Sequence, residues 1–435
     1  MCTFVSIKYI KATNIVILNR FNMKKNIIFI IFAFLYFVTT PVFCQQSRAI
    51  AQMKADVGFL SSDAMKGRLT GSIFQDIAAE YIASRFSEIG LKTKGDKNTY
   101  MQTFYFSPAA DPHSTSPTLA TGQDSLKIIN VAGYIDNNAA QTLIIGAHYD
   151  HLGDGHSGFS LSTEGGIHNG ADDNASGVSV MLYLAETLVK TKSKYNYLFL
   201  AFSGEEYGLW GSNYFVKHPT VDLTKVAAMI NLDMVGRLKD DNSLLIGGVG
   251  TSPIWKSKIE ASNVSKLKLI YEESGSGPSD HTSFYFKDLP VLFFFTGQHS
   301  DYHKPSDDFD KINFKGMNLI IENIYTLIKS LEKVPSIPFT KTKDEKQEKM
   351  EMKVTLGIMP DYMYNEGGLR VDGVKEDRPA QKAGLQVGDI IMELGKFKIA
   401  EIQSYMEALN GISPGEKVIV KFRRNNQMMS SDVQF

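Results

Sequence analysis

Cysteine is almost absent from this chain, and it occurs only near the N-terminus. Of the 435 residues, two are cysteine, Cys2 and Cys44, and both belong to the N-terminal segment described below. A disulfide framework and a cysteine-ligated zinc site are therefore excluded for the rest of the chain. Any metal site there must be built from histidine and carboxylate side chains.

An excess of charge of either sign is also lacking. The chain has 46 Lys and Arg residues against 47 Asp and Glu residues, a formal net charge of −1, and no dense basic stripe. This balance gives no support to nucleic-acid binding or to broad electrostatic attachment to a membrane. Hydrophobic residues make up 43% of the chain, enough for a sizeable core, and the length suggests two or three domains.

An apolar run long enough to span a membrane is lacking too. Ile27 to Val38 is apolar, but a transmembrane helix needs about 20 such residues. Two lysines precede the run, and a boundary at Cys44 follows it, which together indicate a secretory signal peptide over residues 1–44. Met23 is an alternative start. We expect an exported protein that begins at Gln45, with a lipid anchor on Cys44 and an uncleaved membrane anchor as alternatives.

Four short apolar runs predict buried strands, and stretches with helical spacing separate them. The runs are Thr142–Ala147, Tyr195–Phe202, Val226–Leu232 and Val291–Phe295. Helices are predicted within residues 48–95, stopping at Gly90, from Val178 to Leu188, and from Met317 to Leu331. The alternation predicts an α/β fold with a mixed, largely parallel central sheet flanked by helices. Ligands of such sheets bind beyond the carboxyl ends of the strands.

The chain divides into two predicted folded units. Residues 45–333 form the α/β unit, residues 334–351 contain prolines and then mixed charges typical of a linker, and residues 352–435 form a second unit of domain size. Internal repeats and low-complexity tracts are not evident.

Five polar segments each end or follow an apolar run, or lead into a helix. They are residues 148–151, 170–177, 203–206, 231–234 and 301–308. Taken alone, each has an ordinary explanation as a strand-end turn, a helix cap or a surface loop. Together they supply two imidazoles and three carboxylates: His148, Asp172, Glu206, Asp233 and His303. If one carboxylate bridges, each of two metal ions receives one histidine, one terminal carboxylate and the shared carboxylate, a set that suits catalytic zinc.

Two further carboxylates in these segments have chemistry that such a site needs. Water activated by a metal ion still requires a nearby base, and one of the adjacent Glu205 and Glu206 could serve while the other binds metal. Asp150 lies on the same side of an extended segment as His148 and can hold the ring of a metal-binding histidine.

These motifs, in this order, resemble the zinc exopeptidase family that includes bacterial leucyl aminopeptidases, glutamate carboxypeptidase-like enzymes and glutaminyl cyclases. The resemblance covers roughly residues 50–333. It implies two zinc ions, one bound by His148 and Asp233, the other by Glu206 and His303, with Asp172 as the bridge. It further implies that Glu205 is the general base, that Asp150 supports His148, and that Tyr302 stabilises a developing oxyanion. A cis peptide bond between Asp172 and Asp173 is also implied.

Two other segments lie near the implied site. The glycine-rich stretch from Leu152 to Asn169 is expected to form a loop over it, with His156 and His168 as bystanders rather than ligands. Residues 279–281 (Ser-Asp-His) resemble a family motif near the metal ions, and a structural hydrogen-bonding role for His281 is equally open.

The C-terminal unit resembles a PDZ domain. Gly384 to Ile391 resembles the PDZ signature, and Pro379 to Ala383 precedes it as in bacterial PDZ domains. Thr355 to Ile358 looks like the loop that receives a peptide carboxylate, and Gln403 to Leu409 like the helix beside the groove. The resemblance implies a small β-rich domain that binds extended peptide ends. A packing module that binds nothing is the alternative.

The resemblance therefore implies a secreted di-zinc aminopeptidase that acts on peptides. Glutaminyl cyclase-like or carboxypeptidase activity on the same fold is the first alternative, and a non-catalytic PDZ-bearing binding protein is the second. Peptides are the expected partners, with no nucleic acid and no membrane span. Side-chain preference, the physiological metal and the oligomeric state are not fixed by the sequence.

Overall fold

The computed structural model describes residues 50–107, 118–119, 125–155, 159–162, 165–342, 354–361, 364, 366–374, 377–400 and 402–435. The predicted signal peptide with Cys44, the residue His156 and the linker residues 343–351 lie outside the described residues. Among the described helices, none combines the length and apolarity needed to cross a membrane.

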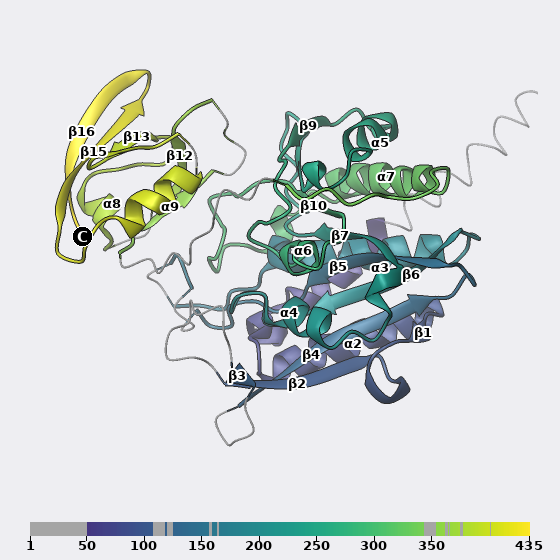
Figure 1. Ribbon diagram of the computed structural model, residues 1–435. Coiled ribbons are helices and arrows are strands. Elements are labelled where there is room, and N and C mark those ends of the chain that lie inside the picture. Colours follow the sequence, from purple (N-terminus) through teal and green to yellow (C-terminus); the bar gives the residue numbers. More distant parts are fainter. Residues whose placement is uncertain are drawn as a thin grey trace, which may run out of the picture. The chain divides into compact units, whose positions relative to one another are not determined.

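The larger sheet of the described chain is mixed, with a parallel centre (Figure 1). Its order is β3-β2-β4-β6-β5-β7-β10-β8-β9, and β1 also pairs with β4. Strands β6, β5, β7 and β10 run parallel to one another, whereas β4 and β8 flank them antiparallel. The strands are β1 Lys92–Thr93, β2 Met101–Ser107, β3 Thr118–Leu119, β4 Leu126–Ile135, β5 Gln141–His148, β6 Tyr195–Phe202, β7 Val226–Leu232, β8 Ser243–Gly247, β9 Lys268–Tyr271 and β10 Val291–Phe295.

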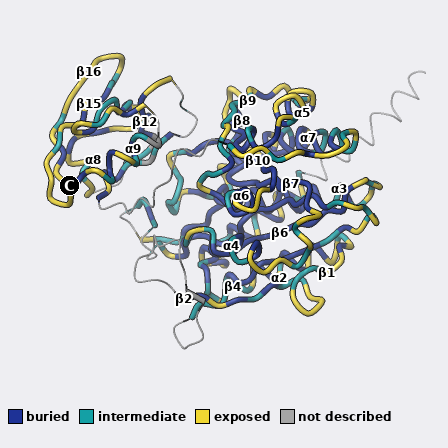
Figure 2. The backbone as a smooth tube through the Cα atoms, viewed as in Figure 1, coloured by how far each residue is buried: buried dark blue, intermediate teal, exposed yellow. Residues whose placement is uncertain are grey.

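Helices cover the central strands on both faces. They are residues 50–60, α2 Ile73–Ile89, α3 Gly177–Leu188, α4 Trp210–Lys217, α5 Trp255–Ser262, α6 His281–Tyr285 and α7 Phe314–Leu331. Short irregular turns are η1 Asp63–Arg68, η2 Asp96–Asn98, η3 Ala171–Ser176, η4 Leu223–Lys225, η5 Val249–Thr251 and η6 Phe309–Lys311. Every residue of β6, β7 and β10 is buried, which explains why these strands are predominantly apolar in sequence (Figure 2). The predicted α/β architecture is confirmed.

One helix prediction was wrong in extent. Residues 48–95 are not one helix, because η1 and a turn interrupt them between residue 60 and α2. Ser72 starts α2 by accepting a hydrogen bond from the Gln75 amide, a serine N-cap that begins a new helix. The predicted stop at Gly90 is confirmed, with φ of 89° at the C-cap.

The C-terminal unit is a separate antiparallel sheet with its own core. Its order is β11-β12-β13-β15-β16, and β14 pairs with β13. The elements are β11 Ile358–Pro360, β12 Leu369–Val374, α8 Pro379–Lys382, β13 Ile390–Leu394, β14 Phe397–Lys398, α9 Ile402–Asn410, β15 Lys417–Arg424 and β16 Gln427–Gln434. Buried residues such as Leu356, Ile391 and Phe422 form its core. The predicted helix over Gln403–Leu409 is α9, and the small β-rich unit is confirmed.

The α/β unit keeps making contacts beyond residue 333. Phe339 packs against its core, with its ring centroid 5.9 Å from that of Tyr285. The Thr340 amide donates to the Thr251 carbonyl at 2.8 Å, and the Thr342 hydroxyl donates to the Tyr285 hydroxyl at 2.8 Å. The first part of the predicted linker is therefore attached to the α/β unit through Thr342.

Phe339→Ala is expected to lower the free energy of unfolding of the α/β unit by about 1–2 kcal/mol, because a partly buried aromatic side chain returns to water. Phe286→Ala is the control. Phe286 also neighbours Tyr285, at 5.6 Å between ring centroids, but is 60% exposed. Urea unfolding of both variants measures the difference, and an equal effect would show that Phe339 stabilises the unit no more than an exposed phenylalanine does.

Candidate metal centre

The polar segments meet beyond the carboxyl ends of the four central parallel strands. His148 is the last residue of β5, Glu205 and Glu206 follow β6, and Asp233 follows β7. His303 lies in the loop after β10. Parallel strands end at one edge of the sheet, which brings together residues that are far apart in the sequence.

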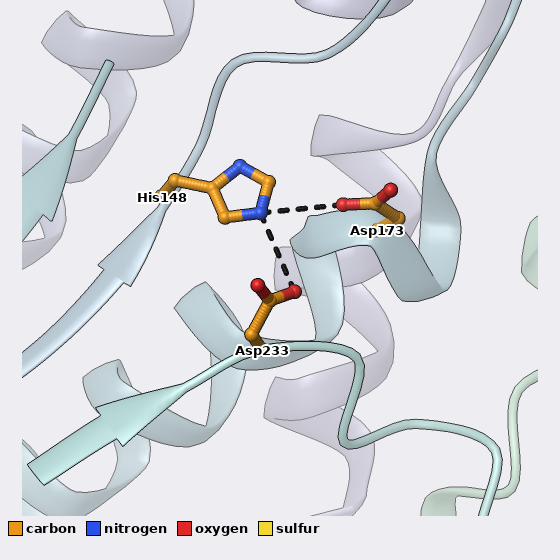
Figure 3. Close-up of side chains that lie close together, drawn as sticks. All are labelled: His148, Asp173 and Asp233. Carbon is orange, nitrogen blue, oxygen red and sulfur yellow. Dashed lines mark hydrogen bonds and ion pairs between the residues drawn. The ribbon is translucent and has the colours of Figure 1, made fainter. Parts of the chain in front are cut away.

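The first donor group contains one imidazole and two carboxylates (Figure 3). The His148 Nε2 atom lies 3.2 Å from Asp173 Oδ1 and 3.4 Å from Asp233 Oδ1. The second oxygen of Asp233 accepts a hydrogen bond of 2.7 Å from Ser279. Ser279 in turn accepts one of 2.7 Å from the Asn231 side chain. Asp233 is thereby held in place, with Oδ1 turned toward His148.

The second donor group uses the other oxygen of Asp173. His303 Nε2 lies 3.3 Å from Asp173 Oδ2 and 3.1 Å from Glu206 Oε2. His151 approaches the same carboxylates, with Nδ1 at 2.7 Å from Glu206 Oε1 and 3.8 Å from Asp173 Oδ2. Asp173 therefore belongs to both groups.

The donor chemistry of both groups fits a divalent metal such as zinc. In each group, the ligand atoms of three residues lie within 4.8 Å of one another: His148, Asp173 and Asp233 in the first, and His151, Asp173 and Glu206 in the second. Nitrogen and carboxylate oxygen are ligands that zinc prefers in catalytic sites, where three protein ligands leave a position open. The buried, charge-rich setting also favours a bound cation.

Asp172 does not take the shared position predicted for it. Asp172 Oδ1 accepts hydrogen bonds from the Gly236 amide at 2.6 Å and the Ser176 hydroxyl at 3.0 Å, and Oδ2 lies 3.1 Å from His299 Nε2. The non-proline cis peptide bond joins Asp173 to Asn174, so its predicted position was wrong by one residue. Two adjacent aspartates in η3 point in different directions, and local sequence does not tell which one faces the strand ends.

Glu205 and Asp150 both lie beside His148. Glu205 Oε2 is 3.9 Å from His148 Nε2, and the Glu205 amide donates to Asp150 Oδ1 at 3.3 Å. The carbonyl oxygen of Asp150 lies 3.3 Å from the far ring nitrogen of His148, and its Oδ1 lies 3.7 Å from it. Burial, followed by the Glu206 and Asp233 charges, raises the pKa of Glu205 well above its usual range against the opposing effect of His148.

Mutual attraction sets the protonation of the second group. Burial lowers the pKa of His303, but the carboxylates of Glu206 and Asp173 together outweigh burial and raise this pKa to about 10. Burial likewise raises the pKa of Glu206, but His303 and His151 together outweigh burial and lower this pKa to about 2. The protein groups alone therefore hold a proton on the imidazole beside an ionised carboxylate, so a metal ion that binds here must displace that proton.

The remaining predicted residues surround this centre. Tyr302 stacks on His303, with ring centroids 3.8 Å apart. The described part of the glycine-rich loop lies against His303, since Leu161 donates to its carbonyl at 3.0 Å and its Nδ1 lies 3.1 Å from the Phe159 carbonyl. His168 Nε2 lies 2.9 Å from the Ser160 hydroxyl, and its ring centroid lies 6.4 Å from that of His151.

His281 is a neutral packing residue. Its ring stacks on Phe293 at 4.6 Å between centroids, and burial lowers its pKa to about 3.

Sequence reasoning missed three residues of the centre: Asp173, His151 and His299. Asp173 and His151 lie within the polar segments predicted to form the site. The sequence therefore identified the correct segments but not which residue of each faces the centre. His299 is part of no motif, and only its 3.1 Å approach to Asp172 brings it to the site.

Glycine permits the close approach of η3 and α3 to the end of β7. A Cβ atom on Gly177 would lie 2.5 Å from the Leu232 carbonyl oxygen and 2.4 Å from Asn174 Oδ1. The Asn174 side chain bridges these elements, donating to the Leu232 carbonyl and accepting from the Gly177 amide, both at 2.9 Å. This contact fixes Asp173 relative to Asp233.

Gly177→Ala is expected to destabilise the protein by about 1–3 kcal/mol and to weaken zinc binding, because the added methyl group separates α3 from β7. Gly165→Ala is the matched control, since a Cβ atom there meets no atom within 4 Å. Thermal unfolding and zinc titration of the two variants provide the test. Equal zinc affinity in both would contradict this account of the glycine.

The sequence of this chain matches two known protein families. The family model described as peptidase family M28 matches residues 130–328, and the model described as PDZ domain matches residues 342–435. Aminopeptidase YwaD of Bacillus subtilis is 28% identical over 232 residues, which cover 50% of this chain and 48% of that protein. The chain thus spans about half the length of the first curated relatives it matches.

Solved structures share the fold of the α/β unit. BSAP, a zinc aminopeptidase from Bacillus subtilis, has a TM-score of 0.50 at 18% identity, covering 67% of this chain and 98% of that chain. The glutaminyl cyclase of Bacteroides thetaiotaomicron has a TM-score of 0.51 at 18% identity, covering 65% of this chain and 97% of that chain. The sequence matches and the site geometry lead to one identification: this chain carries a peptidase family M28 domain, which contains both donor groups, followed by a PDZ domain.

Proposed function

We propose that this protein is a zinc-dependent exopeptidase that removes N-terminal residues from peptides. The observation that carries the proposal is the sharing of Asp173 by two buried donor groups, with the Glu205 carboxylate 3.9 Å from His148. The match to an aminopeptidase over half of this chain and the fold of a zinc aminopeptidase support it.

We assign His148 and Asp233 to one zinc ion, His303 and Glu206 to the other, and Asp173 to both. In this assignment, His151 donates to Oε1 of Glu206, which leaves Oε2 for the metal. When bound, the two ions polarise the scissile carbonyl and lower the pKa of water. The two-ion count remains a proposal that zinc analysis of the purified chain can test.

The chain's own residues would then move the proton and hold the charge. Glu205 accepts a proton from the attacking water and delivers it to the leaving amine. Asp150, which receives a hydrogen bond of 2.7 Å from Thr70, orients the His148 ring from its far side. We assign to the Tyr302 hydroxyl the stabilisation of the oxyanion, a role that Tyr302→Phe would test through kcat.

Release of a fluorophore from a panel of aminoacyl substrates tests the activity. The full chain is assayed with added zinc and after removal of metal with a chelator. We expect release that requires zinc and that ranks the substrates by side chain. A zinc-loaded chain that releases nothing from any substrate would overturn the aminopeptidase assignment.

Glutaminyl cyclase activity is the second candidate, because a glutaminyl cyclase shares the fold. A peptide with N-terminal glutamine separates the two: an aminopeptidase releases free glutamine, whereas a cyclase releases ammonia and leaves the chain length unchanged. A peptide with a blocked N-terminus that is shortened from its C-terminus would instead show a carboxypeptidase.

We propose that the PDZ domain binds an extended peptide end. Strand β11 is the last strand at one end of the described sheet, and an edge strand can pair with an added peptide strand. Titration of the full chain with peptides that have a free or an amidated C-terminus tests this role. Absence of binding in both cases would favour a packing module.

Export is also a proposal. Residues 1–44 would direct the chain across a membrane and be removed, so that the mature protein begins at Gln45. N-terminal sequencing and the intact mass of the protein from its native host decide between this cleavage, a lipid on Cys44 and an uncleaved anchor.

A further inference from the structure

Arg68 is a fully buried arginine whose hydrogen bonds go to backbone carbonyls of three separate segments. Its Nε donates to the Tyr149 carbonyl at 2.7 Å, and Nη2 donates to the Gly170 carbonyl at 3.0 Å. Its Nη1 donates at 2.6 Å to the carbonyls of both Leu60 and Asn169. The side chain has no exposed surface. Such a guanidinium fixes the relative position of every segment it bonds.

Two of these segments carry the metal ligands. Tyr149 directly follows His148, at the end of β5, whereas Gly170 lies three residues before Asp173, at the start of η3. The guanidinium of Arg68 therefore ties the strand that carries His148 to the turn that carries Asp173. These are the two residues whose separation, 3.2 Å between Nε2 and Oδ1, defines the first donor group.

The residues around Arg68 pair with the same loop. The Thr70 hydroxyl donates to Asp150 Oδ2 at 2.7 Å, and the His151 amide donates to the Arg68 carbonyl at 3.3 Å. The Gly153 amide donates to the Gly67 carbonyl at 3.0 Å. Residues 66–70, hereafter the 66–70 segment, therefore run beside residues 149–153.

The backbone of the 66–70 segment is held in an unfavourable conformation. Lys66, Gly67 and Arg68 have φ values of 46°, 68° and 45°, in the left-handed region that costs a non-glycine residue about 1–2 kcal/mol. A Cβ atom on Gly67 would lie 2.5 Å from the carbonyl oxygens of Gly153 and His168. Strain of this kind persists where surrounding contacts over-determine it, and it concentrates at functional sites.

Charge also links Arg68 to the metal centre. Burial lowers the pKa of Arg68 to about 10, which still leaves the guanidinium charged at neutral pH. The carboxylates of Asp173, Asp150, Asp307 and Glu206 act in the opposite direction and stabilise this charge. The charge can therefore persist in the interior, where the guanidinium donates four hydrogen bonds to carbonyl oxygens.

We propose that Arg68 is a positioning residue of the metal centre: by binding the carbonyls of Tyr149, Asn169 and Gly170, it sets the placement of His148 relative to Asp173. This inference rests on the proposed function only in taking those two residues as zinc ligands. It goes beyond the proposed function because Arg68, which holds the metal-binding segments in place, belongs to neither donor group.

Arg68→Lys separates positioning from charge. Lysine keeps the positive charge, but its three donors share one nitrogen and cannot reproduce the spread of Nε, Nη1 and Nη2 over the carbonyls that Arg68 binds. If Arg68 acts through geometry, Arg68→Lys weakens zinc binding by about 10- to 100-fold, the usual effect of losing a residue that orients metal ligands. If Arg68 supplied only a counter-charge, the lysine variant would bind zinc as the wild type does.

Arg85→Lys is the matched control for placing a lysine in a buried arginine site. Arg85 is also buried, but its contacts are with Asp56 and with Glu88 on its own helix α2. We expect Arg85→Lys to lower the melting temperature of the metal-free chain without changing its zinc affinity. Arg68→Lys is expected to change both.

The experiment measures zinc affinity of the full chain by competition with a chromophoric chelator, at a temperature well below unfolding. The visible spectrum of the cobalt-loaded chain reports the geometry of the site independently of activity. Unchanged affinity and spectrum in Arg68→Lys, or equal weakening in Arg85→Lys, would overturn the positioning role while leaving the proposed function intact. A wild-type chain that binds no zinc would overturn both.

Thr70→Val keeps the inference testable if Arg68→Lys does not fold. This change removes only the hydroxyl that the 66–70 segment donates to Asp150, in a side chain of similar shape. We expect weaker zinc binding, by up to about tenfold, the lower end of effects on residues that orient metal ligands. Zinc affinity equal to that of the wild type would show that the 66–70 segment does not position the ligands.

Discussion

Asp173→Asn is expected to lower the zinc content of the protein at both positions and to reduce activity by more than about 100-fold. The reason is that the two oxygens of Asp173 serve different groups, with Oδ1 at 3.2 Å from His148 and Oδ2 at 3.3 Å from His303. An amide offers one neutral oxygen in place of two charged ones. The loss of activity should therefore exceed the 10- to 100-fold loss typical of replacing a residue that only orients the metal ligands.

Asp172→Asn is the matched control, one residue earlier in the same turn. An asparagine oxygen can still accept from the Gly236 amide and Ser176, while its amide nitrogen faces His299. We expect near-normal zinc content and a loss of activity of at most about 10- to 100-fold. Metal analysis of the dialysed variants separates the two aspartates. The opposite result, with zinc lost in Asp172→Asn and kept in Asp173→Asn, would restore Asp172 as the bridge.

Glu205→Gln is expected to lower kcat by about 10²- to 10⁴-fold without changing zinc content, because it removes a proton acceptor and keeps the shape of the side chain. Burial is the main reason that the pKa of Glu205 is raised, and neighbouring carboxylates raise it further. Bound cations oppose the shift and keep the carboxylate available near neutral pH. Since the base acts in its ionised form, kcat of the wild type should fall as the pH drops through this pKa.

Glu206→Gln separates the roles of the two adjacent glutamates. Glu206 contacts His303 and His151 at 3.1 and 2.7 Å, so its replacement should lower zinc content as well as kcat. Metal analysis and pH profiles of both variants provide the test. If Glu205→Gln keeps the wild-type kcat, or loses zinc as Glu206→Gln does, Glu205 is not the general base.

The sheet was predictable because its central strands are buried on both faces. Tyr195–Phe202, Val226–Leu232 and Val291–Phe295 match β6, β7 and β10 residue for residue, since total burial leaves a predominantly apolar run. The secondary structure of the region before β1 was harder to predict from the sequence. A strained turn at Lys66 to Arg68 breaks the helical pattern there, and the contacts that hold this turn come from residues about 80 to 100 positions away.

The chemical content of the site was predictable for a related reason. Side chains that follow apolar runs gather at one edge of a parallel sheet, so His148, Glu205, Glu206 and Asp233 could be placed together from order and spacing alone. Their number and type already pointed to a metal site of nitrogen and oxygen donors. The glycines and small residues near Asp173 also indicated close packing, which Gly177 shows against the Leu232 carbonyl.

The sequence alone thus determined the α/β fold and the segments that form the metal centre, because burial and strand order leave periodic traces in the chain. The PDZ unit was predicted from its resemblance to a known signature. Only the tertiary structure decided which residue of each segment faces the centre. Asp172 and Asp173 are equivalent in local sequence, and the hydrogen bonds of Asp172 to Gly236 and Ser176 separate them. Arg68 and His151 were likewise recognised only through contacts between residues distant in the chain, since such contacts depend on three-dimensional packing and leave no local pattern.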